Sequence, residues 1–197
     1  MVTNPHDRDG WVEQLDYIAL DTRRSLDLDD DLALAARNDI AAFELIYTRN
    51  RSAVYRYLRT RTISGDDAAD LTALTFERAF VAIGRYRPGG VGVRAWLFRI
   101  ARNASIDHGR RRLAEPPPDR PPESNEGPEL RIVADEDATE LRQRVAALPP
   151  DQRDAIVLRF AAGLTAREIG AVLGKTEAAS QKLVSRGLAV LKEAYRV

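Results

Sequence analysis

The feature that most constrains this chain is a proline-rich, acidic interruption between two segments of helical periodicity. Six prolines occur between Pro116 and Pro128, and residues 113–140 carry nine acids and two bases. Proline and mutual charge repulsion favour extended backbone, so we expect a linker over residues 113–136. Fully stretched, its two dozen residues span roughly 80 Å. The sequence therefore predicts two small bodies joined by a tether.

Both flanking segments are predicted to be helical. Apolar residues keep a helical period from Leu32 to Leu58 and beyond Ser64, and no stretch alternates in the manner of a strand. Capping boxes and glycine stops mark the helix ends. The predicted starts are Ser64 (with Asp67), Asp151, Thr165 (with Glu168) and Thr176, and the predicted stops are Gly84, Gly163 and Gly174. The fold class is therefore all-α, with an N-terminal helical bundle.

Charge is strongly segregated along the chain although the formal net charge is +0. The net charges are −6 for residues 1–31, +3 for 32–93, +5 for 94–112, −7 for 113–140 and +5 for 141–197. Two basic bodies connected by an acidic strap indicate two surfaces for a polyanion. We expect four parts: an acidic extension (1–30), a helical domain (31–112), the linker (113–136) and a C-terminal helical domain (137–197).

Several function classes find little support in the sequence. There is no cysteine, and the two histidines, His6 and His108, lie far apart, so a thiolate or imidazole metal site or nucleophile has little to draw on. No nucleophile–base pair or phosphate loop is present. There is no secretion signal and no apolar run of membrane-spanning length. We expect a soluble cytoplasmic protein that is not an enzyme, has no cofactor and does not insert into membranes.

The segment from Arg94 to Arg112 is predicted to be one helix with six arginines. At about 100° per residue, an apolar arc forms on one side; it comprises Val93, Leu97, Ile100 and Ala104. An adjacent stripe comprises Trp96, Arg99, Asn103 and Arg110. Arginine neutralises phosphates, an aromatic ring stacks on bases and an amide pairs with base edges. The alternative is a solvated basic helix with Trp96 in the core.

The C-terminal segment has the spacing of a helix-turn-helix. A short helix opened by Thr165 ends at Leu173, Gly174 makes the turn, and a last helix runs from Thr176 to about Tyr195. The residues that its second helix would offer to a DNA groove are Glu177, Ser180, Gln181, Lys182, Ser185 and Arg186. An ordinary three- or four-helix bundle remains the alternative.

Four motifs together make the chain resemble bacterial sigma factors of the extracytoplasmic-function (ECF) class of the sigma-70 family. In the first half they are D-D-A-A-D-L-T-A-L-T-F-E-R-A-F (Asp66 to Phe80) and W-L-F-R-I-A-R-N-x-x-I-D (from Trp96). In the second half they are L-P-P-D-Q-R-D-A-I-V-L-R-F (Leu148 to Phe160) and G-L-T-A-R-E-I-G-A-V-L-G (Gly163 to Gly174). The match covers about residues 30–112 and 137–197.

The resemblance implies a role for each body. The first would bind core RNA polymerase (beta and beta-prime subunits) and melt promoter DNA, and the second would contact the minus-35 element. The matching polymerase-binding residues are Asp67, Asp70, Leu71, Thr75 and Arg78. Those matching the minus-10 and melting surface are Tyr86, Arg87, Arg94, Trp96, Arg99, Asn103, Arg110 and Arg111. Arg167 and Lys175 would contact minus-35 phosphates beside the helix from Thr176. The resemblance also implies an anti-sigma factor partner.

The chain departs from the family pattern in three places. Ala73 and Leu74 replace a common glutamine–glutamate pair, Gln181 and Leu183 stand at usually basic positions, and the acidic extension is additional. We hypothesise that the extension covers a basic DNA-binding face or contacts a regulatory partner. The linker either threads toward the polymerase active site, as the resemblance implies, or is a plain tether.

Two rival functions are consistent with a helix-turn-helix. One is a transcriptional regulator that binds duplex DNA without polymerase, and dimer-spaced palindromic binding would support it. The other is a helical protein-interaction module that binds a partner but supports no transcription. Promoter-dependent transcription with core polymerase separates both from a sigma factor.

Overall fold

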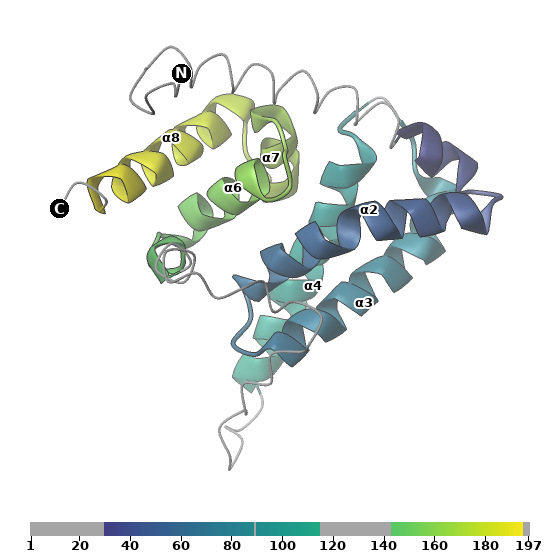
Figure 1. The fold of residues 1–197 in the computed structure, drawn as a ribbon, viewed down its shortest axis with the longest axis horizontal. Helices are drawn as coiled ribbons and strands as arrows, with labels where there is room; N and C mark the ends of the chain where they lie inside the picture. The colour runs from purple at the N-terminus through teal and green to yellow at the C-terminus, as the bar shows by residue number, and fades with distance from the viewer. Residues whose placement is uncertain (1–29, 89, 115–142, 195–197) are drawn as a thin grey trace, which may run out of the picture.

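The computed structural model describes residues 30–88, 90–114 and 143–194. All regular structure within these ranges is helical, as the periodicity predicted. The linker and the acidic extension lie almost entirely outside the described residues. Figure 1 shows two groups of helices, which we name the N-terminal body (residues 30–114) and the C-terminal body (residues 143–194).

The N-terminal body is built from three long helices. They are α2 (Ile40–Arg59), α3 (Gly65–Ala82) and α4 (Val93–Ala114), with a short 3-10 helix η1 (Ile83–Arg85) after α3. Residues 30–35 are also helical and precede α2. Each of the three long helices packs against the other two. Their apolar sides meet in a core that includes Ile46, Leu58, Phe76 and Leu97.

Side-chain caps start two of these helices, and the one at Ser64 was predicted. The Asp39 carboxylate accepts a hydrogen bond from Ala41 N at 2.9 Å and begins α2. The Ser64 hydroxyl accepts one from Asp67 N at 3.0 Å and begins α3, so this predicted cap is confirmed. Both side chains satisfy amide groups that have no partner within the first turn.

The C-terminal body contains α6 (Pro150–Phe160), α7 (Ala166–Leu173) and α8 (Glu177–Ala194). Thr165 and Glu168 form the predicted capping box, and Gly174 adopts the predicted left-handed conformation with φ 69°. Thr176 also caps α8, with Ala179 N donating to its hydroxyl at 3.2 Å. The predicted cap at Asp151 is wrong. The helix begins at Pro150 after Pro149 without a side-chain cap, and Asp151 pairs with Lys175 instead.

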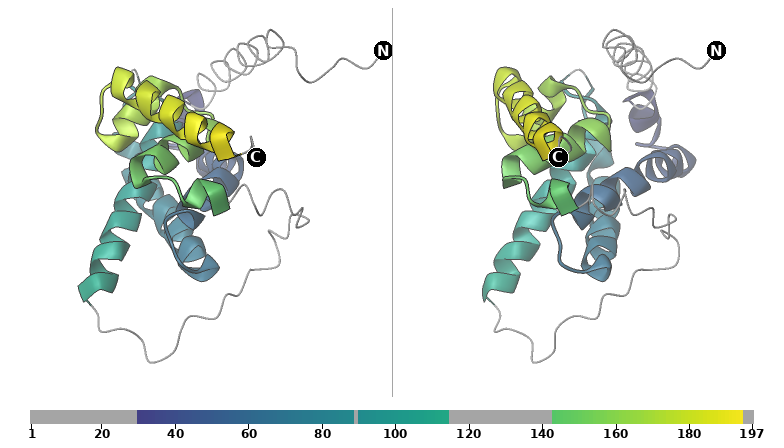
Figure 2. Two further views of the ribbon diagram at one scale, coloured as in Figure 1. Left: turned by 90° about the vertical axis from the view of Figure 1, so that its left-hand side faces the viewer. Right: turned by 60° about the vertical axis from the view of Figure 1, so that its left-hand side comes forward.

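The two bodies lie against each other instead of standing apart. α7 packs on α4 and α6 touches α2, and the two views of Figure 2 agree on this arrangement. Buried side chains from both bodies, among them Leu97 and Leu158, belong to one continuous apolar cluster. The sequence predicted both bodies but did not predict this docked arrangement.

Candidate nucleic-acid interface

The cationic stripe predicted on α4 is present at the protein surface. Arg99, Asn103, Arg110 and Arg111 are all exposed, whereas Val93, Leu97 and Ala104 are fully buried. Ile100, the fourth residue of the predicted apolar arc, is half-buried. Arginines and an amide on one edge of a rigid helix form a track that suits a phosphate backbone and base edges.

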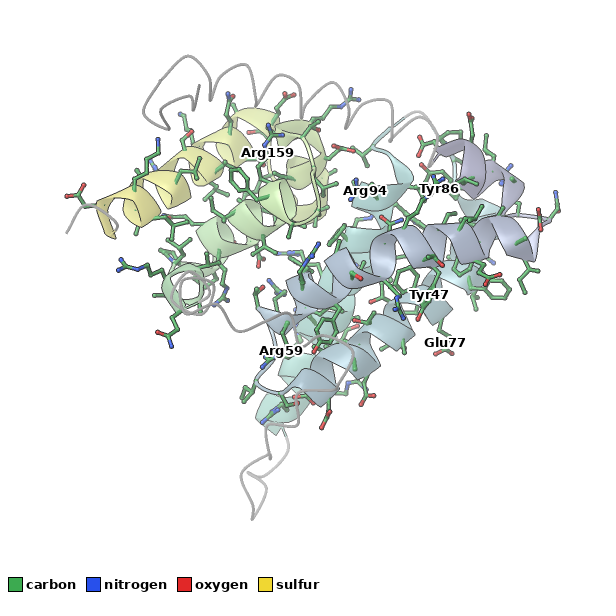
Figure 3. All side chains as sticks on the ribbon, viewed as in Figure 1. Tyr47, Arg59, Glu77, Tyr86, Arg94 and Arg159 are labelled. Atoms are coloured by element: carbon green, nitrogen blue, oxygen red, sulfur yellow. The ribbon has the colours of Figure 1, made fainter. Side chains whose placement is uncertain are left out.

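Trp96 lies at the border between this stripe and the core. Its ring is half-buried, packs against the apolar cluster and lies 5.3 Å from the Tyr86 ring, centroid to centroid. Arg94, also half-buried, lies near Tyr86 at the same end of the N-terminal body (Figure 3). Trp96 therefore takes part in the core and still has an accessible edge, so the two alternatives for this residue are not exclusive.

Tyr86 is buried in this conformation, with 4% of its surface exposed. Its hydroxyl donates to the Asp30 carboxylate at 2.7 Å, and the same carboxylate oxygen accepts from Val93 N at 2.7 Å. Burial raises the pKa of the Tyr86 hydroxyl, and the hydrogen bond to Asp30 raises it further, so the group is a stable donor. The predicted base contact by Tyr86 is therefore not available here, whereas Arg87 is exposed.

Asp30, the last residue of the predicted acidic extension, has a structural role that its local sequence does not indicate. It joins the loop around Tyr86 to the start of α4, and its carboxylate occupies the position of a helix N-cap. Arg37 supports the same loop by donating to the Tyr86 carbonyl oxygen at 2.8 Å. The spacing gives no hint of this contact, because 63 residues separate Asp30 from Val93.

The five predicted polymerase-binding residues of α3 do not share one surface. Asp70 is exposed, but Leu71 and Thr75 are buried, and the Thr75 hydroxyl donates to the Leu71 carbonyl oxygen at 2.6 Å. A direct contact by Leu71 or Thr75 is contradicted by this geometry. Both lie on the apolar side of the helix with Ala68 and Ala79, and that spacing could have identified them as core residues.

The other two predicted residues of α3 tie this helix to α4. Asp67 accepts from Arg112 at 3.0 Å and lies 3.7 Å from His108, and Arg78 lies 3.6 Å from Asp107. These pairs fix the far end of α4 against α3 while leaving Asp67 and Arg78 partly accessible.

The C-terminal body presents a broad polar face on α8. Gln181, Lys182, Ser185 and Arg186 are exposed and, with Ala178, line an open groove. Thr176 and Glu177 at the start of the helix are exposed as well. This is the arrangement expected of a recognition helix, with side chains free to enter a major groove.

Three details of the helix-turn-helix refine the predicted contacts. Ser180 is fully buried, and its hydroxyl donates to the Thr176 carbonyl oxygen at 3.0 Å, so the prediction that it contacts DNA is wrong. A Cβ on Gly170 would lie 2.7 Å from the Lys175 carbonyl oxygen, which shows how closely α7 approaches the turn. Leu183, at a position that is basic in the family pattern, packs toward the core.

The predicted phosphate contacts flank this face. Arg167 and Lys175 are both exposed, and Lys175 lies 2.9 Å from Asp151. A phosphate would have to share the Lys175 ammonium with that carboxylate.

A charged contact that was not predicted joins the two bodies. Arg61, just after α2, forms an ion pair with Asp154 of α6, and its Nε donates to Ser105 of α4 at 2.7 Å. The side chains of Arg61 and Asp154 are only 16% and 3% exposed. The run D-A-I-V-L from Asp154 offered a signal, since an acid amid apolar helix residues needs a partner when it is buried.

No group of three or more histidine, cysteine or carboxylate side chains gathers at metal-binding distance in the part of the chain that the structure describes. Nor is any helix in these ranges long and apolar enough to cross a bilayer. The arrangement offers cations, amides and aromatic edges, which suit nucleic-acid binding.

Two family models match the chain, one for each body. The model described as Sigma-70 region 2 matches residues 46–114, and the model described as Sigma-70, region 4 matches residues 138–191. The boundary between the matches falls on the predicted linker.

Similar proteins are described as ECF RNA polymerase sigma factors. The ECF RNA polymerase sigma factor BldN of Streptomyces coelicolor is 34% identical over 163 residues, which are 80% of this chain and 61% of BldN. The ECF RNA polymerase sigma factor SigD of Mycobacterium tuberculosis is 31% identical over 179 residues, which are 84% of this chain and 82% of SigD. This chain thus spans about three fifths of BldN and most of SigD.

A solved structure shares the fold. CnrH, determined in complex with the cytosolic domain of CnrY, superposes with a TM-score of 0.62 at 25% identity. The superposition covers 85% of this chain and 96% of CnrH.

Proposed function

The chain belongs to the extracytoplasmic-function class of the sigma-70 family, and from that premise we propose that it is a transcription initiation factor. It binds core RNA polymerase, recognises a minus-35 and a minus-10 promoter element, and promotes separation of the DNA strands. The observation that carries this proposal is the pairing of an exposed arginine–asparagine stripe on α4 with a helix-turn-helix in one chain.

In the proposal, α4 holds the separated strand at the minus-10 element. Arg99, Arg110 and Arg111 neutralise phosphates, and Asn103 reaches a base edge. The accessible edge of Trp96 stacks on an unpaired base. Tyr86 would join it only if the contact with Asp30 were released, because its ring and hydroxyl are otherwise engaged.

The C-terminal body would contact the minus-35 duplex through the exposed face of α8. Gln181 and Arg186 are suited to base edges in the major groove, and Lys182 and Ser185 to edges or phosphates. Arg167 and Lys175 would position the helix on the backbone. Gln181 and Leu183 stand where the family pattern has basic residues, and Leu183 packs toward the core. Fewer cations would therefore contact phosphate than in the family pattern.

Polymerase binding is assigned to the exposed side of α3. Asp70, together with the accessible edges of Asp67 and Arg78, faces away from the core. Charged groups at the rim of an interface steer association and set its register. CnrH, which shares this fold, was solved with a protein partner, and we extend that to an anti-sigma factor for this chain.

The proposed mechanism involves no covalent step by the protein. Unstacking costs a few kcal/mol per base, and contacts with captured bases and phosphates offset it. The polymerase, which works on the chromosome in the cytoplasm, then uses the open strand.

Promoter-dependent transcription with purified core polymerase tests the proposal. The full chain should co-elute with core and direct transcription, and Trp96→Ala should impair open-complex formation, seen by permanganate footprinting, more than closed-complex binding. Ile40→Ala, which truncates a 73% exposed apolar side chain at the start of α2, is the control. Failure to co-elute with core, or palindromic duplex binding without polymerase, would favour a plain helix-turn-helix regulator.

A further inference from the structure

Asp30 joins the two ends of the connection between η1 and α4, which we call the 87–92 loop. One oxygen of its carboxylate, Oδ1, accepts a hydrogen bond from the Tyr86 hydroxyl and another from Val93 N, each at 2.7 Å. Tyr86 follows η1 directly, and Val93 is the first residue of α4. A single side chain from outside the loop therefore fixes where the chain leaves η1 and where it enters α4.

The 87–92 loop depends on such a tie to hold one shape. Three of its six residues are glycine, and ordering glycine costs more backbone entropy than ordering any other residue. The residue before α4 is Gly92, which has no side chain that could cap the helix. Asp30 supplies the acceptor for one of the amide groups that lack a partner in the first turn.

Arg37 provides a second tie at the same end of the loop. Its guanidinium donates to the Tyr86 carbonyl oxygen at 2.8 Å, and Arg87 donates to the same oxygen at 3.1 Å. Asp30 and Arg37 both belong to the short segment before α2. Tyr86 is thus held at its hydroxyl by an acid and at its backbone by a base.

The position of Tyr86 determines the surroundings of Trp96. The two rings lie 5.3 Å apart, centroid to centroid, with an angle of 54° between their planes. Tyr86 is buried, whereas Trp96 is half-buried. The Tyr86 ring therefore supports the residue whose accessible edge is proposed to stack on an unpaired base.

We propose that Asp30 is a positioning residue of the minus-10 site, which holds the 87–92 loop and the Tyr86 ring so that Trp96 and Arg87 are ready to receive the separated strand. The inference deepens the proposed function and rests on it. Asp30 acts through its neighbours, since a carboxylate would repel the phosphates of the strand. Order imposed before binding does not have to be created during binding.

Four single substitutions separate the two hydrogen bonds from the negative charge. Asp30→Ala removes both bonds, and Tyr86→Phe removes one of them while keeping the ring. Asp30→Asn keeps an oxygen that can accept both bonds, so it should behave like the parent chain. Asp31→Ala removes the same charge from the adjacent, exposed position and is the matched control.

Tryptophan fluorescence of the free full-length chain tests the geometry without DNA. The sequence has two tryptophans, so Trp11→Phe leaves Trp96 as the only one. In that background Asp30→Ala should shift the Trp96 emission to longer wavelength and increase its quenching by acrylamide, because the loosened ring gains contact with water. Circular dichroism identifies a temperature at which every variant is folded. A Trp96 signal that Asp30→Ala leaves unchanged would overturn the positioning role.

Binding of a pre-melted strand tests the consequence for the site. The complex of each variant with core polymerase is titrated with a fluorescent single-stranded minus-10 oligonucleotide, taken from the promoter used in the transcription assay, and with strands in which one base is changed. Asp30→Ala should weaken binding of the unchanged strand by on the order of 10-fold, because the loop and Trp96 must then be ordered during binding. It should also reduce the preference over the changed strands. Tyr86→Phe should cause a smaller loss in the same direction, and Asp31→Ala none.

A minus-35 duplex is the control for folding in the same complex. The C-terminal body of all variants should bind it as the parent chain does, whereas a general loss of structure would weaken both kinds of binding. If the parent chain directs transcription but Asp30→Ala binds the strand as well as Asp31→Ala does, the positioning role is overturned and the proposed function stands. If the parent complex binds no minus-10 strand, the proposed function fails and the positioning role fails with it, even where the fluorescence shows that Asp30 holds the loop.

Discussion

α4 and α8 are both cation-bearing helices with a candidate DNA-binding face, but they are built into the molecule differently. At about 100° per residue, the buried residues of α4 spread over roughly 200° of its circumference, and those described on α8 (Ser180, Gly187 and Leu191) over roughly 40°. α4 packs against α2, α3 and α7, whereas α8 packs mainly on α6 and α7, with Leu148 and Val145 at its inner side.

This difference determines how much surface each helix can offer. α4 presents a narrow stripe on a helix held from several sides, which suits a rigid support for a single strand. α8 presents a wide polar face that fits a groove. Substitutions on α4 should therefore affect stability and DNA binding together, and those on the outer face of α8 should affect DNA binding alone.

The largest expected effect is a loss of folding stability when a buried side chain of α4 is truncated. Phe98 is fully buried and its ring packs edge-to-face on Tyr57 at 5.5 Å. Phe98→Ala should lower the free energy of unfolding by about 3–5 kcal/mol, because it leaves a cavity in the core. On α8, Val190→Ala at a 51% exposed position should change it by no more than about 0.5 kcal/mol. Urea titration measures both, and equal losses would contradict the comparison.

Replacing a glycine by alanine should lower the stability of the protein in α8 and raise it in α4. A Cβ on Gly187 of α8 would lie 2.8 Å from the Ile156 side chain, so Gly187→Ala should destabilise the protein by about 1–3 kcal/mol. Gly109 of α4 has no such neighbour within 4 Å, so Gly109→Ala should stabilise it by about 0.5–1 kcal/mol through helix propensity. Thermal unfolding followed by circular dichroism measures both changes. A Gly187→Ala variant at least as stable as the parent chain would contradict the tight packing of α8 on α6.

The smallest expected effects concern phosphate contacts. Lys182→Ala should reduce the slope of log affinity against log salt by about 0.9 for a minus-35 duplex. Arg99→Ala should reduce it by about 0.7 for single-stranded minus-10 DNA bound to the polymerase complex. Salt titrations of fluorescence anisotropy measure both slopes. An unchanged slope for either variant would remove that side chain from the phosphate contacts.

Much of the fold was predictable because its signals are local. The caps at Ser64, Thr165 and Thr176 and the turn at Gly174 each depend on residues within four positions of one another. Helical periodicity likewise identified the outward stripe of α4. The cap at Asp151 failed because a proline pair starts α6 without a side-chain bond, and the carboxylate then paired with a residue 24 positions away.

The candidate site was less predictable than the helices that carry it. Ser180 looked available on a helical wheel, but the close approach of α7 buries it. Tyr86 lies in a polar turn that was expected to be exposed, but its hydroxyl donates to Asp30, which is 56 residues away in sequence, and its ring is buried. In both cases the deciding neighbour is distant in sequence, and no spacing rule places it.

The sequence by itself determined an all-helical fold and most of the polar residues that α4 and α8 carry outward, and it predicts a linker between the two bodies. These follow from side-chain periodicity, capping chemistry and charge, which act over a few residues. Only the tertiary structure decided that the bodies dock, that Arg61 meets Asp154, and that α4 is covered by α7. Docking depends on matched surfaces and on desolvation of a charged pair, and both arise only when distant segments have already folded.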